Sequence, residues 1–177
     1  MARRILIKGA SGAGKSTLGR ELAARLGLPR VELDALHHGP GWTAASAPEL
    51  RARVTAALDD DRGWVVDGNY DTKLGTLLWE RAELIVWLDL PLRLKLLRLV
   101  RRTARRLMTQ EELWNGNRES LKEAFVGGDA LFPWAVRAHF RQRRSWPAQL
   151  AQLPHVRLKT PAEVEAWLSD FCGEGLT

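Results

Sequence analysis

Cysteine and long apolar runs are nearly absent from this sequence. Its single cysteine, Cys172, excludes an internal disulfide bond and any metal site built from several cysteines. No stretch approaches the roughly 18 uninterrupted apolar residues that a transmembrane helix needs. Acidic residues are in the minority, since 21 Asp and Glu stand against 27 Lys and Arg, for a net charge of +6. The composition therefore predicts no disulfides, no membrane spans and a preference for anionic partners.

The length and the start of the chain favour one domain in the cytoplasm. With 177 residues, 45% of them hydrophobic, the chain can bury one compact core, so we expect a single domain over residues 1–177. The apolar strand predicted at residues 3–8 leads directly into a glycine-rich loop, so we expect no removable leader. The sequence leaves the oligomeric state open.

Residues 9–16, GASGAGKS, match the phosphate-loop pattern G-x-x-x-x-G-K-[ST] at every fixed position. Glycine lets the backbone curl so that successive N–H groups converge on a phosphate, and the following helix directs its positive end to the same anion. Lys15 supplies an ammonium for the β- and γ-phosphates, and Ser16 supplies a hydroxyl ligand for Mg²⁺. The expected nucleotide-binding residues here are Gly9, Ser11, Gly12, Ala13, Gly14, Lys15, Ser16 and Thr17.

Strand and helix patterns alternate along the chain. The predicted strands lie at residues 3–8, 31–33, 64–66, 84–88 and 155–159. Helical patterns cover residues 16–26, 46–58, 91–108, 131–153 and 160–171. With right-handed crossovers this order predicts an α/β fold, a parallel sheet with helices on both faces. In such a sheet, ligands bind beyond the carboxyl ends of the strands.

Three of the predicted strands end in an aspartate. Asp34 is placed to receive the proton of an acceptor hydroxyl or to orient that hydroxyl, although it could equally cap a turn. Asp67 is a candidate Mg²⁺-linked carboxylate beside Ser16. Asp89 precedes a Leu-Pro pair, so it is a candidate for a direct catalytic role or for capping the next helix.

A loop containing His37, His38 and Trp42 follows Asp34. Either histidine could contact an acceptor or lie in a surface loop, and Trp42 could close over an acceptor or pack within the loop. Zinc is not expected, because the single cysteine and the remaining histidines are remote in the sequence.

The helix predicted at residues 91–108 is rich in arginine. Its apolar periodicity predicts that Leu96, Val100, Ala104 and Leu107 face the core and that the arginines lie outside.

Those arginines lie on adjacent helical faces, where like charges four residues apart cost roughly 0.2–0.5 kcal/mol per pair. Some anion should therefore meet them. Phosphoryl transfer needs cations on the migrating group, which makes Arg98 and Arg102 candidates, together with Arg118 further along. The alternative is a solvated face neutralised by nearby glutamates.

Five motifs follow one another: GASGAGKS, DALHHGPGW, VVDGNY, IVWLDLP and, after the arginine-rich helix, WNGNRES. In this order they resemble the small P-loop kinases of the adenylate kinase and shikimate kinase group. Within it, the chain is most similar to the adenylate-kinase-related proteins known as DNA topology modulation (FlaR-type) proteins. The resemblance extends from Arg3 to Phe171.

This resemblance implies a P-loop NTPase fold with five strands in the order 2-3-1-4-5, an acceptor-binding region at residues 35–62 and a lid at residues 109–130. It matches Asp67 to the group's Mg²⁺-associated aspartate, and it implies adenine as the base, bordered by the loop that contains Thr160. The likeness to adenylate kinases stops at Asp71, which replaces an arginine that holds the acceptor nucleotide's phosphate. That replacement argues against a nucleoside monophosphate acceptor.

We therefore expect a kinase that transfers the γ-phosphoryl of ATP, with Mg²⁺, to a small acceptor. The expected catalytic residues are Lys15, Asp34, Asp67, Arg102 and Arg118, with Arg98 and Thr160 on the nucleotide. Two alternatives remain: a nucleotide-regulated DNA-associated protein, although the sequence has no recognisable nucleic-acid-binding module, and a simple NTP hydrolase. The sequence does not identify the acceptor.

Overall fold

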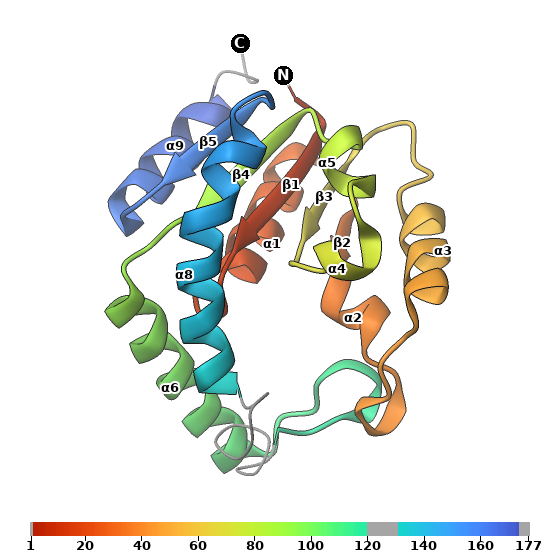
Figure 1. Cartoon of the computed structure of the whole chain (residues 1–177), viewed down its shortest axis with the longest axis vertical. Helices are drawn as coiled ribbons and strands as arrows, with labels where there is room; N and C mark the ends of the chain where they lie inside the picture. Colours follow the sequence, from red (N-terminus) through yellow and green to blue (C-terminus); the bar gives the residue numbers. More distant parts are fainter. Residues whose placement is uncertain (1, 120–130, 174–177) are drawn as a thin grey trace.

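The computed structural model describes residues 2–119 and 131–173 and confirms an α/β fold around one parallel sheet (Figure 1). Its five strands lie in the order β2-β3-β1-β4-β5, the order that the resemblance implies. Every pairing is parallel, so the carboxyl ends of the strands share one edge. The strands are β1 (Arg4–Gly9), β2 (Arg30–Glu32), β3 (Trp64–Asp67), β4 (Leu84–Leu88) and β5 (His155–Leu158).

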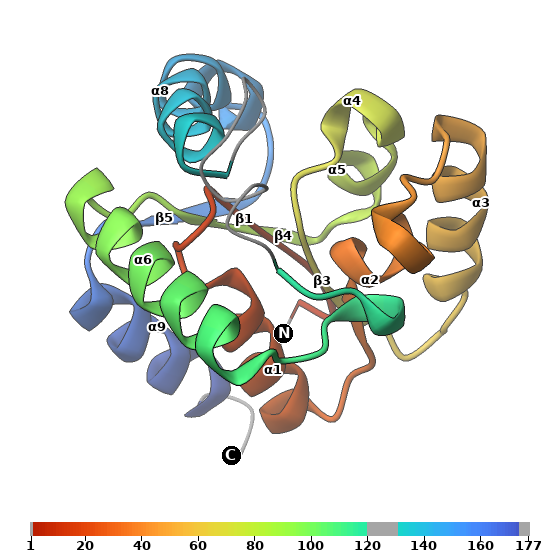
Figure 2. The same ribbon diagram turned by 90° about the horizontal axis from the view of Figure 1, so that it is seen from below.

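The helices between these strands lie on both sides of the sheet (Figure 2). The longer ones are α1 (Lys15–Leu26), α3 (Ala47–Ala57), α6 (Leu92–Thr109), α8 (Leu131–Leu150) and α9 (Pro161–Gly173). Short helical turns form α2 (Leu33–His37), η1 (Pro40–Trp42), α4 (Asp71–Leu74), α5 (Leu77–Arg81) and η2 (Trp114–Gly116). No helix in the described ranges is long and apolar enough to cross a membrane.

Alternating side chains of β1 build a core on each face of the sheet. Ile5 and Ile7 pack with α1 and α9, whereas Leu6 faces a second core that α3, α5 and α8 complete. Strands buried on both faces are typical of parallel sheets, which explains the continuous apolar runs in the sequence. The Ser-x-x-Glu pattern of residues 46–49 forms a capping box at the start of α3, because Ser46 and Glu49 each bond the other's backbone N–H.

Strand β2 lies one residue earlier than the sequence pattern predicts. It ends at Glu32, and Asp34 lies in the short helix α2 instead of at a strand end. Asp34 therefore reaches the sheet's carboxyl edge from the first turn of a helix.

The predicted orientation of the arginine-rich helix α6 is wrong. Its buried residues are Lys95, Leu99 and Thr103, whereas Val100 is 49% exposed. The helix is rotated because two of these positions are polar and have partners elsewhere in the fold: the Lys95 ammonium pairs with His139 of α8, and Thr103 donates to Glu119. Burial of a bonded polar group costs far less than burial of an unpaired one.

None of the four apolar positions expected to face the core is buried. Of the four positions expected inside, Ala104 is exposed like Val100, and two are only partly buried, Leu96 and Leu107. The rotation turns one arginine row, Arg98, Arg102 and Arg106, into partly buried positions, while Arg101 and Arg105 stay exposed.

Close packing of α6 on the phosphate loop yields a stability prediction. Gly12 has φ +78°, and a Cβ there would lie 2.3 Å from the Lys95 carbonyl oxygen, whereas Gly27, at φ +63°, has open space around it. Gly27→Ala should cost about 1–2 kcal/mol of unfolding free energy for the left-handed backbone, and Gly12→Ala about 1–3 kcal/mol more because α6 must move. Urea unfolding without nucleotide measures both. Equal losses would contradict the close approach.

Candidate functional site

The phosphate loop lies between β1 and α1 with its glycines in left-handed conformations, Gly12 at φ +78° and Gly14 at φ +96°. The Lys15 ammonium lies over the loop, 3.4 Å from the Ala10 carbonyl oxygen. Arg98 reaches the loop from α6, with Nη1 3.5 Å from the Ala13 carbonyl oxygen. The loop's backbone therefore lies between two cations, an arrangement that suits a polyphosphate.

Ser16 and Asp67 meet as the sequence predicts. The Ser16 hydroxyl donates to Oδ1 of Asp67 at 3.0 Å, and Asp67 is only 2% exposed. Arg30 binds the other carboxylate oxygen, Oδ2, through Nε at 3.0 Å and Nη2 at 2.8 Å. A hydroxyl and a carboxylate oxygen are hard ligands of the kind that Mg²⁺ prefers. Because Arg30 occupies only Oδ2, the Oδ1 atom beside Ser16 stays available to a metal ion. The residues present therefore fit a magnesium ion.

Glu32 joins this group although the sequence analysis did not identify it. The parallel register places Glu32 opposite Asp67, and its carboxylate lies 3.4 Å from the Ser16 hydroxyl and 3.2 Å from Arg30. Its position as the last residue of β2 was the available signal, since that edge of a parallel sheet carries the ligands.

Asn69 braces the start of the phosphate loop, a role that the sequence did not reveal. Its side-chain amide donates to the Gly9 carbonyl oxygen at 2.5 Å and accepts from the Gly9 N–H at 3.4 Å. These two bonds tie the end of β1 to the segment after β3. Only its place directly after the Asp-Gly pair hinted at this role.

Lys15 sits among the charged residues that the sequence assigns to catalysis. Burial lowers the pKa of its ammonium, the carboxylates of Asp34 and Asp67 partly offset that effect, and Arg102 adds to it. Burial, followed by repulsion from Arg106, likewise lowers the pKa of Arg102. Two nearby cations in a site of low polarity demand an anion, and a nucleotide's phosphates would supply it.

Asp34 is held by Tyr70, the chain's only tyrosine. The Tyr70 hydroxyl donates to Oδ1 of Asp34 at 2.6 Å and lies 3.3 Å from Nε2 of His38. Burial, with the Asp34 charge, raises the pKa of Tyr70, so the hydroxyl keeps its proton. This bond fixes the direction of the Asp34 carboxylate.

His37 and His38 do not lie in a solvated surface loop. His37 is 7% exposed and packs on Tyr70 with ring centroids 4.5 Å apart. His38 makes edge contact with Trp42 at 5.2 Å and stacks on Trp114 at 5.8 Å. Together these five residues form an aromatic cluster beside Asp34. The described residues contain no group of three His, Cys, Asp or Glu that could hold a metal.

The segment after α6 lies against the turn that carries Trp42 (Figure 1). Asn117, only 4% exposed, accepts from the Trp42 N–H at 2.8 Å and donates to the Gly39 carbonyl oxygen at 2.9 Å. Asn115 donates to the His38 carbonyl oxygen, and the Trp42 indole donates to the Arg118 carbonyl oxygen. We call these contacts the lid latch, since they join the described part of the expected lid to the expected acceptor region.

The cations expected around the site divide into two sets. Arg105 and Arg106 are paired with Glu111 and Glu119, as the neutralisation alternative predicts. Arg98 reaches the phosphate loop and Arg102 lies within electrostatic range of Lys15, so their contact with a phosphate stays a prediction.

Two further predicted nucleotide or catalytic residues lie elsewhere. The Arg118 side chain is exposed on the lid, and only its backbone contacts the acceptor region. The Thr160 hydroxyl accepts from the Glu163 N–H at 3.1 Å and caps α9, so contact with a base remains a prediction. The rest of the expected lid, residues 120–130, lies outside the described residues.

Asp89 does not cap the next helix, and its carboxylate is engaged in ion pairs instead. It is 1% exposed and binds Arg143 of α8 and Arg157 of β5, at 2.8 Å and 2.6 Å. Burial raises the pKa of its carboxyl group, but the hydrogen bonds of both arginines outweigh that effect and the net pKa is lowered. Asp89 therefore joins α8 to the sheet.

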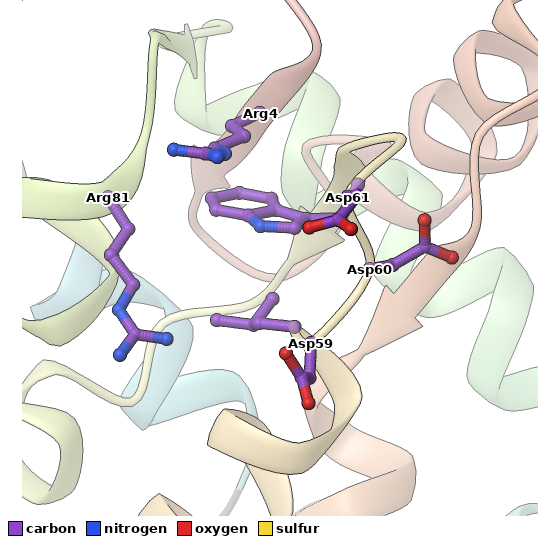
Figure 3. A pocket seen from close by; sticks show the side chains of 7 residues that line it. Arg4, Asp59, Asp60, Asp61 and Arg81 are labelled. Carbon is purple, nitrogen blue, oxygen red and sulfur yellow. The ribbon is translucent and has the colours of Figure 1, made fainter.

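A separate hollow of about 220 Å³ lies at the opposite, amino-terminal edge of the sheet (Figure 3). Arg4 and Arg81 line it together with Asp59, Asp60 and Asp61. It lies far from the phosphate loop, because Arg4 begins strand β1 and the loop follows the other end of that strand.

The geometry agrees with comparisons to solved structures. The chain is similar to a shikimate kinase from Acinetobacter baumannii in complex with shikimate (19% identity, 99% of this chain and 96% of that one, TM-score 0.56). It is also similar to a deoxyadenosine kinase from M. mycoides with bound dATP (12%, 98% and 100%, 0.60) and to a gluconokinase from Sinorhizobium meliloti 1021 (19%, 98% and 95%, 0.52). The chain has the P-loop kinase fold. No protein-family model and no curated protein matches the sequence.

The buried His37 predicts a pH-dependent stability. Burial, followed by the Lys73 charge, lowers the pKa of His37 from 6.5 to about 4. The folded state therefore binds fewer protons than the unfolded state below pH 6.5, so stability is lost as the pH falls. Between pH 7 and pH 5 the wild type should lose about 1–2 kcal/mol more unfolding free energy than His37→Leu. Urea unfolding at both values measures this, and parallel losses would contradict a neutral His37.

The hydrogen bonds of Asn117 allow the stability of the lid latch to be tested. Removing its amide in Asn117→Ala leaves buried backbone groups of both segments unpaired, so amide hydrogen exchange should accelerate at least about ten-fold over residues 38–43 and 111–119. Arg118→Ala is the matched control, because only the Arg118 backbone takes part in the latch. Unchanged exchange in Asn117→Ala would show that the latch does not hold the two segments together.

Proposed function

We propose that the protein is an ATP-dependent kinase that transfers the γ-phosphoryl group of Mg·ATP to a hydroxyl group of a small acceptor. One observation carries the proposal: the Tyr70-bound carboxylate of Asp34 lies close enough to Lys15 to influence its pKa. A group able to receive a hydroxyl proton therefore lies within electrostatic range of the group that would bind the migrating phosphoryl. A P-loop protein that only hydrolyses its nucleotide does not need such a second site.

Each residue of the site has a distinct role in the proposed reaction. The phosphate loop and Lys15 hold the β- and γ-phosphates, and Arg98 and Arg102 neutralise the charge on the group in transfer. Magnesium, held at Ser16 and Asp67, would further neutralise the phosphates. The bond between the γ-phosphorus and the ADP oxygen breaks, and a new bond to the acceptor oxygen forms. Asp34 orients the acceptor hydroxyl and takes its proton, so the products are ADP and a phosphate monoester.

The expected lid would exclude water during this transfer. A hydroxyl acceptor competes with water for the γ-phosphoryl, and closure of a lid removes the competitor. The lid latch supports this role, because it joins residues 115–118 to the acceptor side of the site. The kinase folds of the neighbours give the proposal its reaction class, while the likeness to DNA topology modulation proteins remains a proposal from sequence motifs.

The test is ADP formation from Mg·ATP, with and without a panel of nucleosides, sugars and hydroxy acids. Lys15→Ala should lower acceptor-dependent turnover at least about 100-fold with the fold intact, because a charge on the transition state loses its partner. Asp34→Asn should lower kcat about 100-fold while ATP binding persists. Arg20→Ala is the control, since it removes one exposed cation from the same helix as Lys15.

Different results favour the alternatives. Turnover that no acceptor stimulates, and that Asp34→Asn leaves unchanged, would indicate an NTP hydrolase. Retained transfer in Lys15→Ala would end the kinase proposal. Salt-sensitive binding of duplex DNA without turnover would support the DNA-associated alternative.

A further inference from the structure

The cations that border the acceptor region are already engaged. Helices α3 and α4, both fully described, carry Arg51, Arg53 and Lys73. Lys73 donates to the Ala45 carbonyl oxygen at 2.6 Å, Arg53 to that of Leu36 at 2.8 Å and Arg51 to that of Lys73 at 2.8 Å. Each cation thus binds a backbone carbonyl and helps hold the acceptor region in shape.

The buried cation behind this region is engaged as well. Lys8 is 1% exposed, forms an ion pair with Asp71 and lies over the Trp79 and Trp146 rings. Asp71 stands where adenylate kinases have a phosphate-binding arginine. Its carboxylate is therefore already paired, with the buried Lys8.

The two histidines do not supply a positive charge. Burial lowers the pKa of His37 to about 4 and lowers that of His38, so both rings are neutral near pH 7. The Asp34 side chain stands beside them, joined to His38 through the Tyr70 hydroxyl. The acceptor side of the site thus presents the Asp34 side chain and neutral rings, and the Lys73 ammonium within electrostatic range of both rings is bonded to the Ala45 carbonyl oxygen. The phosphate-loop side presents Lys15, Arg98 and Arg102.

The hydrogen-bond network also defines which nitrogen of His38 is unprotonated. The single Tyr70 proton goes to Asp34, so Tyr70 can only accept from Nε2–H of His38. A neutral His38 then has its lone pair at Nδ1, and that atom is buried without a partner, as is Nδ1 of His37. A buried acceptor atom without a partner is costly and is satisfied by a hydroxyl or amide donor.

We infer that the acceptor is an uncharged, ring-containing alcohol: Asp34 binds the hydroxyl to be phosphorylated, a second donor group reaches Nδ1 of His38, and the ring packs on the aromatic cluster of His37, His38, Trp42, Tyr70 and Trp114. This inference rests on the proposed kinase function and narrows its substrate. An acceptor with a carboxylate or phosphate group would lie against Asp34 without a dedicated cation on α3 or α4, and like charges at close range repel.

Two described arginines do not change this assignment. Arg102 lies within electrostatic range of both Lys15 and Asp34, so its charge acts where the phosphoryl group would pass between them. The Arg118 side chain is exposed on the lid surface. Neither forms part of the aromatic cluster.

The test compares matched neutral and anionic compounds: adenosine with AMP, ribose with ribose 5-phosphate, and glucose with gluconate. Calorimetric binding is measured on the whole chain with Mg²⁺ and a non-hydrolysable ATP analogue at 0.15 M salt. At least one neutral member should bind, and at least ten-fold more tightly than its anionic partner. Tighter or equal binding of the anionic partner, or no binding by any neutral compound, overturns the inference.

These measurements distinguish a wrong acceptor class from a wrong assignment as a kinase. Phosphorylation of an anionic compound, with neutral compounds unbound, would reject the acceptor class and retain the kinase. Tight binding of a neutral compound without ADP formation would reject the kinase and, with it, the acceptor role of that compound.

Asp34→Asn tests the source of the selectivity. Because the variant keeps the shape of the side chain and removes its charge, the ratio of anionic to neutral Kd should fall at least five-fold toward one. Asp170→Asn, on the exposed surface of α9, is the control and should leave the ratio unchanged. A ratio that stays the same in Asp34→Asn overturns the electrostatic basis of the inference.

Discussion

The parts of the site depend on the buried carboxylate of Asp67. Parallel pairing places it opposite Ile7 of β1 and Glu32 of β2. At 2% exposure such a charge is tolerated only with partners, and Ser16 and Arg30 provide them. These bonds fix the start of α1, and hence the phosphate loop, against the carboxyl edge of the sheet. Helix α1 comes so close that a Cβ on Gly19 would lie 3.0 Å from Oδ2 of Asp67.

The sequence predicts those features whose signals are local or periodic. The phosphate loop, the alternation of strands and helices and the α3 capping box are of this kind, and the strand order follows from the family resemblance. The α6 rotation escapes prediction because hydrophobic periodicity assumes an apolar core face. Here Lys95 and Thr103 are buried instead, with partners at positions 139 and 119. Tyr70 and Asn69 were missed for a related reason, since their partners lie 36 and 60 residues away.

His38 connects the expected acceptor region with the described part of the expected lid. Its ring lies beside Tyr70 and stacks on Trp114, and its carbonyl oxygen accepts from Asn115. Through Tyr70 the same residue reaches Asp34. The direction of the Asp34 carboxylate and the position of the lid segment are therefore coupled through one imidazole. In the proposed kinase, the binding energy of an acceptor at this cluster would help to complete the catalytic arrangement, which is how induced fit limits transfer to water.

The charges of the site separate along the proposed transfer path. Lys15, Arg98 and Arg102 gather at the phosphate loop, while the cations of α3 and α4 bind carbonyl groups of their own region. Cations close to the migrating group stabilise the charge that develops in transfer. Cations on the far side would instead stabilise a bound anionic acceptor before reaction, which strengthens ground-state binding without lowering the barrier. On the acceptor side, the neutral rings, the Asp34 side chain and the carbonyl-bound cations leave the positive charge concentrated at the phosphate loop. In the proposed reaction, the phosphoryl group leaves ADP at that place.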